Sequence, residues 1–64
     1  MKLTREKFAE FGKAFVDGKF PHQRFGQAFI NFLYTLGLNE TNPTLFYEED
    51  KKKARKIIDT QYLD

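Results

Sequence analysis

The sequence predicts an all-α fold: a small three-helix domain with a short extra helical turn between helices 2 and 3. Three observations support this prediction. Phenylalanines recur at helical spacing near the start of the chain, two glycines (Gly18 and Gly37) stand where helices would end, and the pair Asn42-Pro43 marks a later helix start. The 64 residues are enough for one domain, 1–64, and no more.

The first helix is expected over about residues 4–17. Thr4 is its expected N-cap, because the threonine hydroxyl can accept a hydrogen bond from a free backbone N–H of the first turn. At 100° per residue, one face of this helix collects small and apolar residues: Phe8, Ala9, Phe11, Gly12, Phe15 and Val16. Gly18 then supplies the left-handed backbone conformation that commonly ends a helix.

The second helix is expected over about residues 21–36, with Pro21 in its first turn and Gly37 as its terminator. Apolar residues cover more than half of its helical wheel, and no charged residue occurs between Phe25 and Asn39. A helix this apolar must be covered on two sides. We therefore expect it to be the central helix, packed by the other two.

A short helical turn is expected at about 43–47, within the longest irregular stretch of the chain. Asn42 is a suitable N-cap and Pro43 a suitable first helical residue. Three side chains are expected to anchor the turn to the core: Leu45, Phe46 and Tyr47. The last helix follows over about 50–62, and the acids at its start complement the helix macrodipole: Glu48, Glu49 and Asp50.

Composition restricts how such a short chain can be stabilised. A domain of this size buries only about 60% of the surface that its unfolded chain exposes, and the chain has no cysteine for a disulfide or a thiolate zinc site. Eight phenylalanines and three tyrosines are left to build the core. No apolar run approaches the roughly 20 residues that span a bilayer, and the first residues lead into an amphipathic helix rather than a signal peptide. We expect a cytoplasmic protein with no membrane partner.

No catalytic set is recognisable, so we expect no enzyme activity, no cofactor and no metal site. His22 is the only histidine, and no serine or cysteine nucleophile accompanies it. We expect His22 to pack beside Phe25 and Phe29, near a helix start. The adjacent acids at 48–50 lack the spacing of an EF-hand, and their favourable position at a helix start accounts for them.

The one basic cluster lies in the last helix: Lys51, Lys52, Lys53, Arg55 and Lys56. These side chains could contact the phosphates of a nucleic acid, and such binding would weaken with salt. The alternative, which we favour, is a solvated helix face partly neutralised by the acids that precede it. The formal net charge of +2 is too small to indicate a nucleic-acid partner by itself.

The polar side of the second helix is the least ordinary surface feature. Four uncharged residues lie close together there on the helical wheel: Gln23, Gln27, Asn31 and Tyr34. Because interfaces are enriched in tyrosine and depleted in lysine and glutamate, this strip is a candidate docking face for a partner protein or a second copy of the chain. The alternative is intramolecular: Gln27 and Asn31 bond each other, and Tyr34 fills the gap beneath the 38–49 segment.

Two segments carry a resemblance to known proteins: Arg24-Phe25-Gly26-Gln27-Ala28-Phe29-x-Asn31 and Asn42-Pro43-x-Leu45-Phe46-Tyr47-Glu48-x-Asp50. With these segments the chain, over roughly residues 4–62, resembles small uncharacterised proteins of bacteriophages and prophage-bearing bacteria. Those proteins share R-x-G-Q-x-F-x-N and P-x-L-F-Y-E-x-D segments before a closing helix. The resemblance implies a phage accessory protein that acts inside a bacterial cell, and it brings no catalytic residues.

We therefore expect a small non-enzymatic protein–protein interaction module that binds a host protein and modulates or inhibits it. An anti-defence role, such as inhibition of a CRISPR–Cas system, is one form of this function. The alternative is a nucleic-acid-binding accessory protein that uses Lys51 to Lys56. A homodimer is a further arrangement to test. DNA mimicry is disfavoured, because a mimic should be strongly acidic and this chain is slightly basic.

Overall fold

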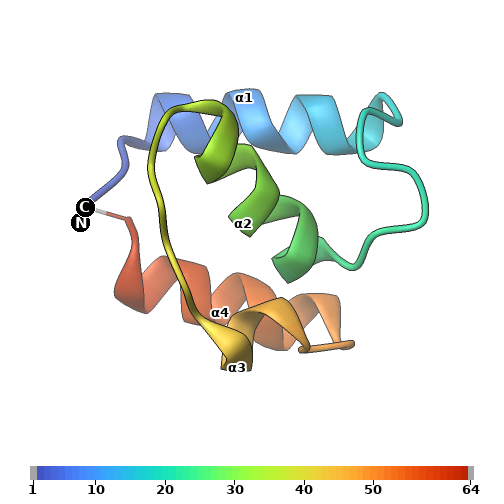
Figure 1. The fold of residues 1–64 in the computed structure, drawn as a ribbon, viewed down its shortest axis with the longest axis vertical. Coiled ribbons are helices and arrows are strands. Elements are labelled where there is room, and N and C mark those ends of the chain that lie inside the picture. The colour runs from blue at the N-terminus through green and yellow to red at the C-terminus, as the bar shows by residue number, and fades with distance from the viewer. Residues whose placement is uncertain (1, 64) are drawn as a thin grey trace.

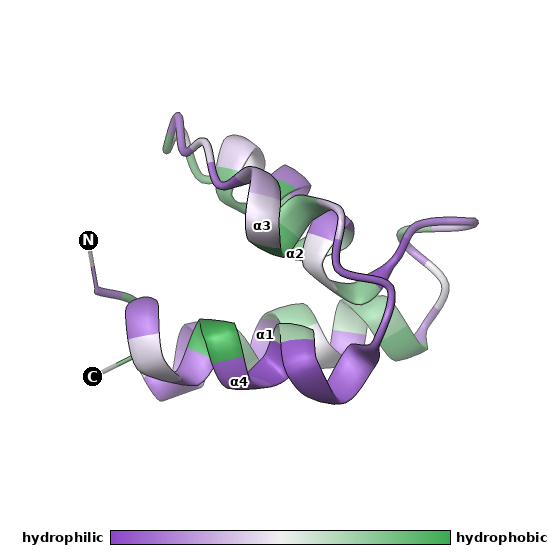
Figure 2. Cartoon of the chain, turned by 90° about the horizontal axis from the view of Figure 1, so that it is seen from below, coloured by the Kyte–Doolittle hydropathy of each residue, from purple (hydrophilic) through white to green (hydrophobic). Residues whose placement is uncertain are grey.

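The computed structural model describes residues 2–63 and contains four helices in that range: α1 (Arg5–Val16), α2 (Phe25–Thr35), α3 (Pro43–Phe46) and α4 (Lys51–Gln61). Helices α1 and α4 lie in one layer and run in opposite directions, and α2 crosses over this layer with α3 beside it (Figure 1, Figure 2). The predicted all-α fold, with a short helix between the second and third long helices, is confirmed. Within the described residues, no helix has the length and apolar character needed to cross a membrane.

Capping residues fix most helix ends. Thr4, Asn42, Gly18 and Gly37 take the roles that the sequence predicts, and Asp50 is a cap at a position where only a macrodipole effect is expected. Side-chain oxygens of Thr4, Asn42 and Asp50 each accept hydrogen bonds from backbone N–H groups in the first turn of α1, α3 and α4. Gly18 and Gly37 follow α1 and α2 with φ angles of 82° and 80°, the left-handed conformation expected of them. Local side-chain chemistry therefore sets where these helices begin and end.

The predicted start of the second helix at Pro21 is wrong, because α2 begins only at Phe25. The backbone N–H of Gln23 donates to the carbonyl oxygen of Phe20 at 3.3 Å, which closes a β-turn. Pro21 takes the second position of this turn and His22, with a φ of 62°, takes the third, as in a type II turn. Proline suits the first turn of a helix and the second position of a β-turn equally well. The sequence around Pro21 therefore does not indicate which of these two structures forms.

The core is a continuous cluster of aromatic and aliphatic side chains. Its largest fully buried members are Phe11, Phe29, Leu33, Leu45 and Ile58. The Phe11 ring lies 5.2 Å from the Phe25 ring and 5.3 Å from the Phe29 ring, both edge to face, which is a preferred arrangement of aromatic pairs. Helix α2 supplies six of the buried residues and packs against each of the other three helices, which confirms its predicted central position.

Helix α1 buries a narrower face than the predicted one. Phe8 and Phe11 are buried and Phe15 is partly buried, whereas Ala9 is exposed and Val16 is 79% exposed. Among the helices, only α2 packs closely against α1. The stripe of Phe8, Phe11 and Phe15 therefore provides most of the packing of α1 against the core.

Gly26 brings α2 and α3 into direct contact. A Cβ atom added to this buried glycine would collide with the carbonyl oxygen of Leu45 and lie 2.9 Å from its Cδ1 atom. No larger residue fits without movement of the backbone. The partner of Gly26 in this close approach is Leu45 of α3. This contact sets the spacing between α2 and α3.

Candidate partner-binding groove

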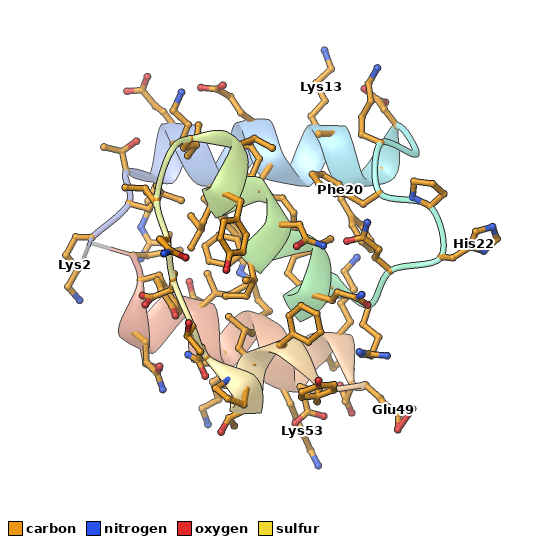
Figure 3. All side chains as sticks on the ribbon, viewed as in Figure 1. Lys2, Lys13, Phe20, His22, Glu49 and Lys53 are labelled. Atoms are coloured by element: carbon orange, nitrogen blue, oxygen red, sulfur yellow. The ribbon has the colours of Figure 1, made fainter. Side chains whose placement is uncertain are left out.

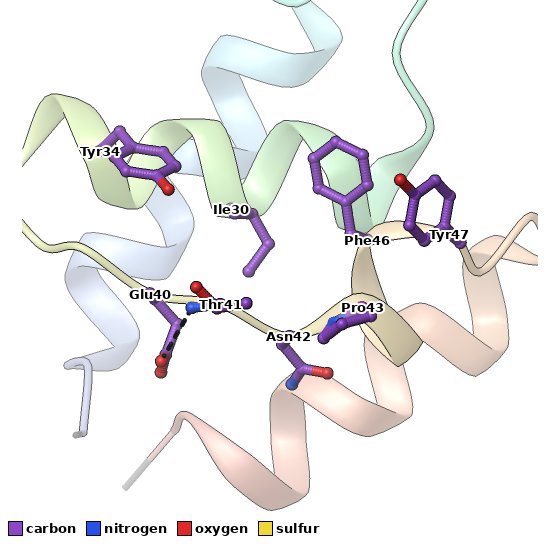
Figure 4. Close-up of a pocket in the computed structure, with 8 residues that line it drawn as sticks. All are labelled: Ile30, Tyr34, Glu40, Thr41, Asn42, Pro43, Phe46 and Tyr47. Atoms are coloured by element: carbon purple, nitrogen blue, oxygen red, sulfur yellow. Dashed lines mark hydrogen bonds between the residues drawn. The ribbon is translucent and has the colours of Figure 1, made fainter.

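A groove of about 230 Å³ opens between α2, the irregular segment 40–42 and α3 (Figure 4). The residues that line it are Ile30, Tyr34, Glu40, Thr41, Asn42, Pro43, Phe46 and Tyr47. Most of the lining surface is apolar, and Glu40 is the only charged residue among the eight. Pockets that bury drug-sized ligands enclose roughly 300–1,000 Å³. The groove is smaller, and it suits one or two side chains of a larger partner.

Two exposed tyrosines flank the groove on opposite sides (Figure 4). Tyr34 on α2 is 52% exposed, and Tyr47 at the end of α3 is 67% exposed. The half-buried Phe46 ring packs edge to face against Tyr47, with 5.0 Å between the ring centroids. The buried side chain of Ile30 lies between the two tyrosines. The result is an apolar space with an aromatic ring at either end.

Arg24, the N-cap residue of α2, supports one side of this groove. Its Nε donates to the carbonyl oxygen of Phe46 at 3.3 Å. Its guanidinium carbon lies 5.7 Å from the centroid of the Tyr47 ring, within the range of a cation–π interaction. Both contacts join the start of α2 to the end of α3. The exposed Tyr47 ring is therefore held in position.

The expectation that all three side chains of the short turn anchor it to the core is wrong for Tyr47. Leu45 is fully buried and Phe46 is half-buried, but Tyr47 is mostly exposed. Helix α3 is a single turn of four residues, so only one of its side chains can point directly into the core. Leu45 takes that position against Gly26. Phe46 packs partly against the core, and Tyr47 is left at the surface, across the groove from Tyr34.

The polar wall of the groove is tied to α4 through Asn42. Its Nδ2 donates to Oε1 of Gln61 and to the hydroxyl oxygen of Tyr62, both at 3.1 Å. Burial is the main cause that raises the pKa of the Tyr62 phenol; the hydrogen bond from Asn42 lowers this pKa, and the nearby carboxylate of Glu40 raises it again. Glu40 thus lies close enough to α4 to act on Tyr62. These contacts hold segment 40–42 in place.

Of the four residues of the predicted strip, only Tyr34 lines the groove. Gln23 precedes α2, and its Oε1 accepts a hydrogen bond from Nδ2 of Asn31 at 2.8 Å. The structure therefore pairs Asn31 with Gln23 rather than with Gln27, which is half-buried. Tyr34 alone is both exposed and part of the groove. It lies beside segment 40–42 and α3, both part of the 38–49 segment that the intramolecular alternative places over it, but its ring stays exposed rather than filling a gap.

The basic cluster of α4 is divided in two, and one part covers aromatic rings of the core. The Nζ atom of Lys51 lies 5.2 Å from the centroid of the Phe25 ring and 5.7 Å from that of the Phe15 ring. The guanidinium carbon of Arg55 lies 4.7 Å over the Phe8 ring. We call this region between α1 and α4 the covered seam: Phe8, Phe15 and Phe25 beneath Lys51 and Arg55.

The other part of the basic cluster consists of Lys52, Lys53 and Lys56. All three are exposed, and none forms an ion pair within residues 2–63. Figure 3 shows Lys53 pointing away from the body of the molecule, and the ribbon of α4 is mostly hydrophilic in Figure 2. The five basic residues therefore divide into two exposed cations that also lie over aromatic rings and three exposed lysines without such contacts among residues 2–63.

His22 and the acids before α4 do not assemble a site. His22 is exposed in its turn and points outward, so the expected packing beside Phe25 and Phe29 is wrong (Figure 3). Asp50 caps α4, and Glu48 accepts a hydrogen bond from the backbone N–H of Asp50. In the described part of the chain, no three histidine, aspartate or glutamate side chains are close enough to hold a metal ion.

Comparison with known proteins adds no relative: no protein-family model, no curated protein and no solved structure matches this chain.

Proposed function

We propose that this protein is a non-enzymatic interaction module that binds another protein through the groove between α2 and α3. The observation that carries the proposal is the pair of exposed tyrosines, Tyr34 and Tyr47, on either side of an apolar space. Tyrosine gives a binding surface large, rigid contact area at small cost in conformational entropy. Two of the three tyrosines of the chain are at this one site.

The partner that we propose is a host protein of a bacterial cell. This part of the proposal rests on the resemblance to small phage proteins. Pro43, Phe46 and Tyr47 of the groove belong to the second resembling segment, and Ile30 lies within the first at a position that its pattern leaves open. Modulation or inhibition of the host protein, for example of a defence system, is the role that the resemblance favours.

Affinity capture from bacterial lysates, followed by mass spectrometry, tests the proposal. The wild-type protein is expected to capture a specific partner, and the double variant Tyr34→Ala, Tyr47→Ala is expected to lose it. Val16→Ala is the matched control, because Val16 is also an exposed apolar residue but lies on α1, away from the groove. Circular dichroism of each variant confirms that it is folded. A partner that binds all three proteins equally would contradict the proposal.

A second candidate function is nucleic-acid binding by the exposed lysines of α4. Lys52, Lys53 and Lys56 lie within two turns of one helix and have no acidic partner among residues 2–63. Three phosphate contacts predict that log K falls with log salt with a slope of about −2 to −3. Fluorescence anisotropy with labelled DNA and RNA at low salt measures this slope. Charge reversal of the three lysines to glutamate should abolish binding, and the absence of any wild-type binding would exclude this function.

A further inference from the structure

Building on the proposed function, we infer that the occupant of the groove is a short, extended, basic segment of the partner protein. In this arrangement a proline enters between Tyr34 and Tyr47. A lysine or arginine of the same segment lies beside Glu40. The size of the groove, its aromatic walls and its single charge support the three parts of this inference.

The size of the groove favours a short extended segment over a docked helix. An amphipathic helix binds through a row of anchors at i, i+3 or i+4, and i+7, which spans about 10 Å at 1.5 Å per residue. The groove has a volume of about 230 Å³ and is bounded by Tyr34 at one side and Tyr47 at the other. It has room for one or two side chains rather than for a row of three.

The walls of the groove favour proline as the inserted residue. Its lining includes three aromatic rings, those of Tyr34, Phe46 and Tyr47, and the ring of Pro43. Aromatic-lined grooves recognise proline-rich segments because the extended polyproline conformation is already formed before binding and loses little entropy. The hydroxyl groups of the two exposed tyrosines can donate to backbone carbonyls, which such a segment leaves free of internal hydrogen bonds.

The charge of the groove favours a basic segment. Glu40 is its only charged lining residue and is half-buried. Its Oε1 accepts a hydrogen bond from the backbone N–H of Thr41 at 3.2 Å, and it has no ion pair among residues 2–63. Arg24, beside Tyr47, is engaged with the Phe46 carbonyl and the Tyr47 ring. A lysine or arginine of the partner would complement Glu40, whereas an acidic residue there would be repelled.

Four fluorescein-labelled peptides test the inference by fluorescence anisotropy. The first is a basic proline peptide, Arg-Pro-Leu-Pro-Pro-Leu. The second replaces its arginine with glutamate, the third replaces its prolines with alanine, and the fourth is an amphipathic helical peptide with the same net charge as the first. We expect the basic proline peptide to bind, and each of the other three to bind at least about fivefold more weakly.

Glu40→Gln provides the decisive comparison. This variant should bind the arginine and glutamate peptides with similar affinity, because the charge that distinguishes them is gone. Glu6→Gln removes the same charge from an exposed position on α1 and should keep the fivefold preference. Equal binding of the arginine and glutamate peptides by the wild-type protein would overturn the inference. No binding of the basic proline peptide would overturn it as well, as would preference for the helical peptide.

Selection of a random peptide library on the immobilised protein separates this inference from the proposed function. Selected peptides that need Tyr34 and Tyr47 but are helical or acidic would overturn the inference and leave the proposed function standing. If no selected peptide and no lysate partner needs the two tyrosines, both fail. Self-association that is lost in Tyr47→Ala would assign the groove to a second copy of the chain and would also overturn the inference.

Discussion

The covered seam and the groove are two aromatic surfaces of the same small domain. They differ in how far other side chains cover their rings. At the covered seam, Lys51 and Arg55 lie over phenylalanine rings, and Arg55 also pairs with Asp59 at 3.6 Å. At the groove, Arg24 lies 5.7 Å from the Tyr47 ring, yet Tyr34 and Tyr47 remain 52% and 67% exposed beside an open apolar space. The same kind of surface is shielded on one side of the molecule and left accessible on the other.

The residue types explain this difference. Phenylalanine has no polar group, so the long side chains of lysine and arginine cover its ring while their charges stay in water. Tyrosine carries a hydroxyl group that water can solvate, so its ring can remain at the surface. The covered seam contributes to the stability of the fold, whereas the groove is available for binding. Each of the following predictions tests one side of this comparison.

The largest expected effect concerns the contact that forms the groove. Gly26→Ala places a methyl group against the carbonyl oxygen of Leu45, and we expect it to lower the free energy of unfolding by about 3 kcal/mol. Gly12→Ala is the matched control, because nothing lies within 4 Å of its added Cβ atom in the interior of α1. It should stabilise the protein by about 0.5–1 kcal/mol. Urea denaturation measures both, and similar values for the two variants would refute the proposed contact.

A smaller effect is expected at the polar wall of the groove, where Tyr62 has a raised pKa. Its unfolded-state value is 10.0, so the stabilisation from the buried neutral phenol is complete below pH 10 and is lost as the pH rises through the higher folded-state pKa. Tyr62→Phe loses the hydrogen bond from Asn42, which costs about 1 kcal/mol at neutral pH. Its stability should then fall less steeply above pH 10 than that of the wild type. Urea denaturation at several pH values above 10 measures both proteins. If the free energy of unfolding falls equally steeply with pH in both, the raised pKa of Tyr62 is contradicted.

The next prediction tests the division of the basic cluster. Lys51→Met removes a charge that lies over the Phe15 and Phe25 rings, and we expect a loss of about 0.5 kcal/mol. Lys52→Met removes the same charge from the neighbouring exposed position and should have no measurable effect on stability. Thermal unfolding followed by circular dichroism compares the two. Equal stability of both variants would show that Lys51 does not stabilise the fold through the covered seam.

The sequence was sufficient to predict the features that depend on neighbouring residues. Thr4 and Asn42 cap helices at the predicted places, because a side-chain cap is a local interaction. The absence of charge along the second helix correctly predicted its central position. By contrast, Pro21 was compatible with two local structures, and the sequence did not indicate which one forms.

The groove depends on contacts between distant residues, and the sequence alone did not predict it. Tyr34 was recognised as a candidate binding residue, but Tyr47 was assigned to the core. Its exposure follows from the one-turn length of α3 and from the position of Leu45 against Gly26, which are 19 residues apart. Likewise, Glu40 becomes a groove residue only because Asn42 fixes its segment to α4.

The most direct test of the central claim is a paired measurement on Tyr34→Ala. The claim is that this ring is exposed for binding and contributes little to folding. The free energy of unfolding should stay within about 0.5 kcal/mol of the wild-type value, while the affinity for the partner captured by the wild type falls by about tenfold or more. A loss of about 2 kcal/mol in stability, with unchanged affinity for that partner, would contradict the claim.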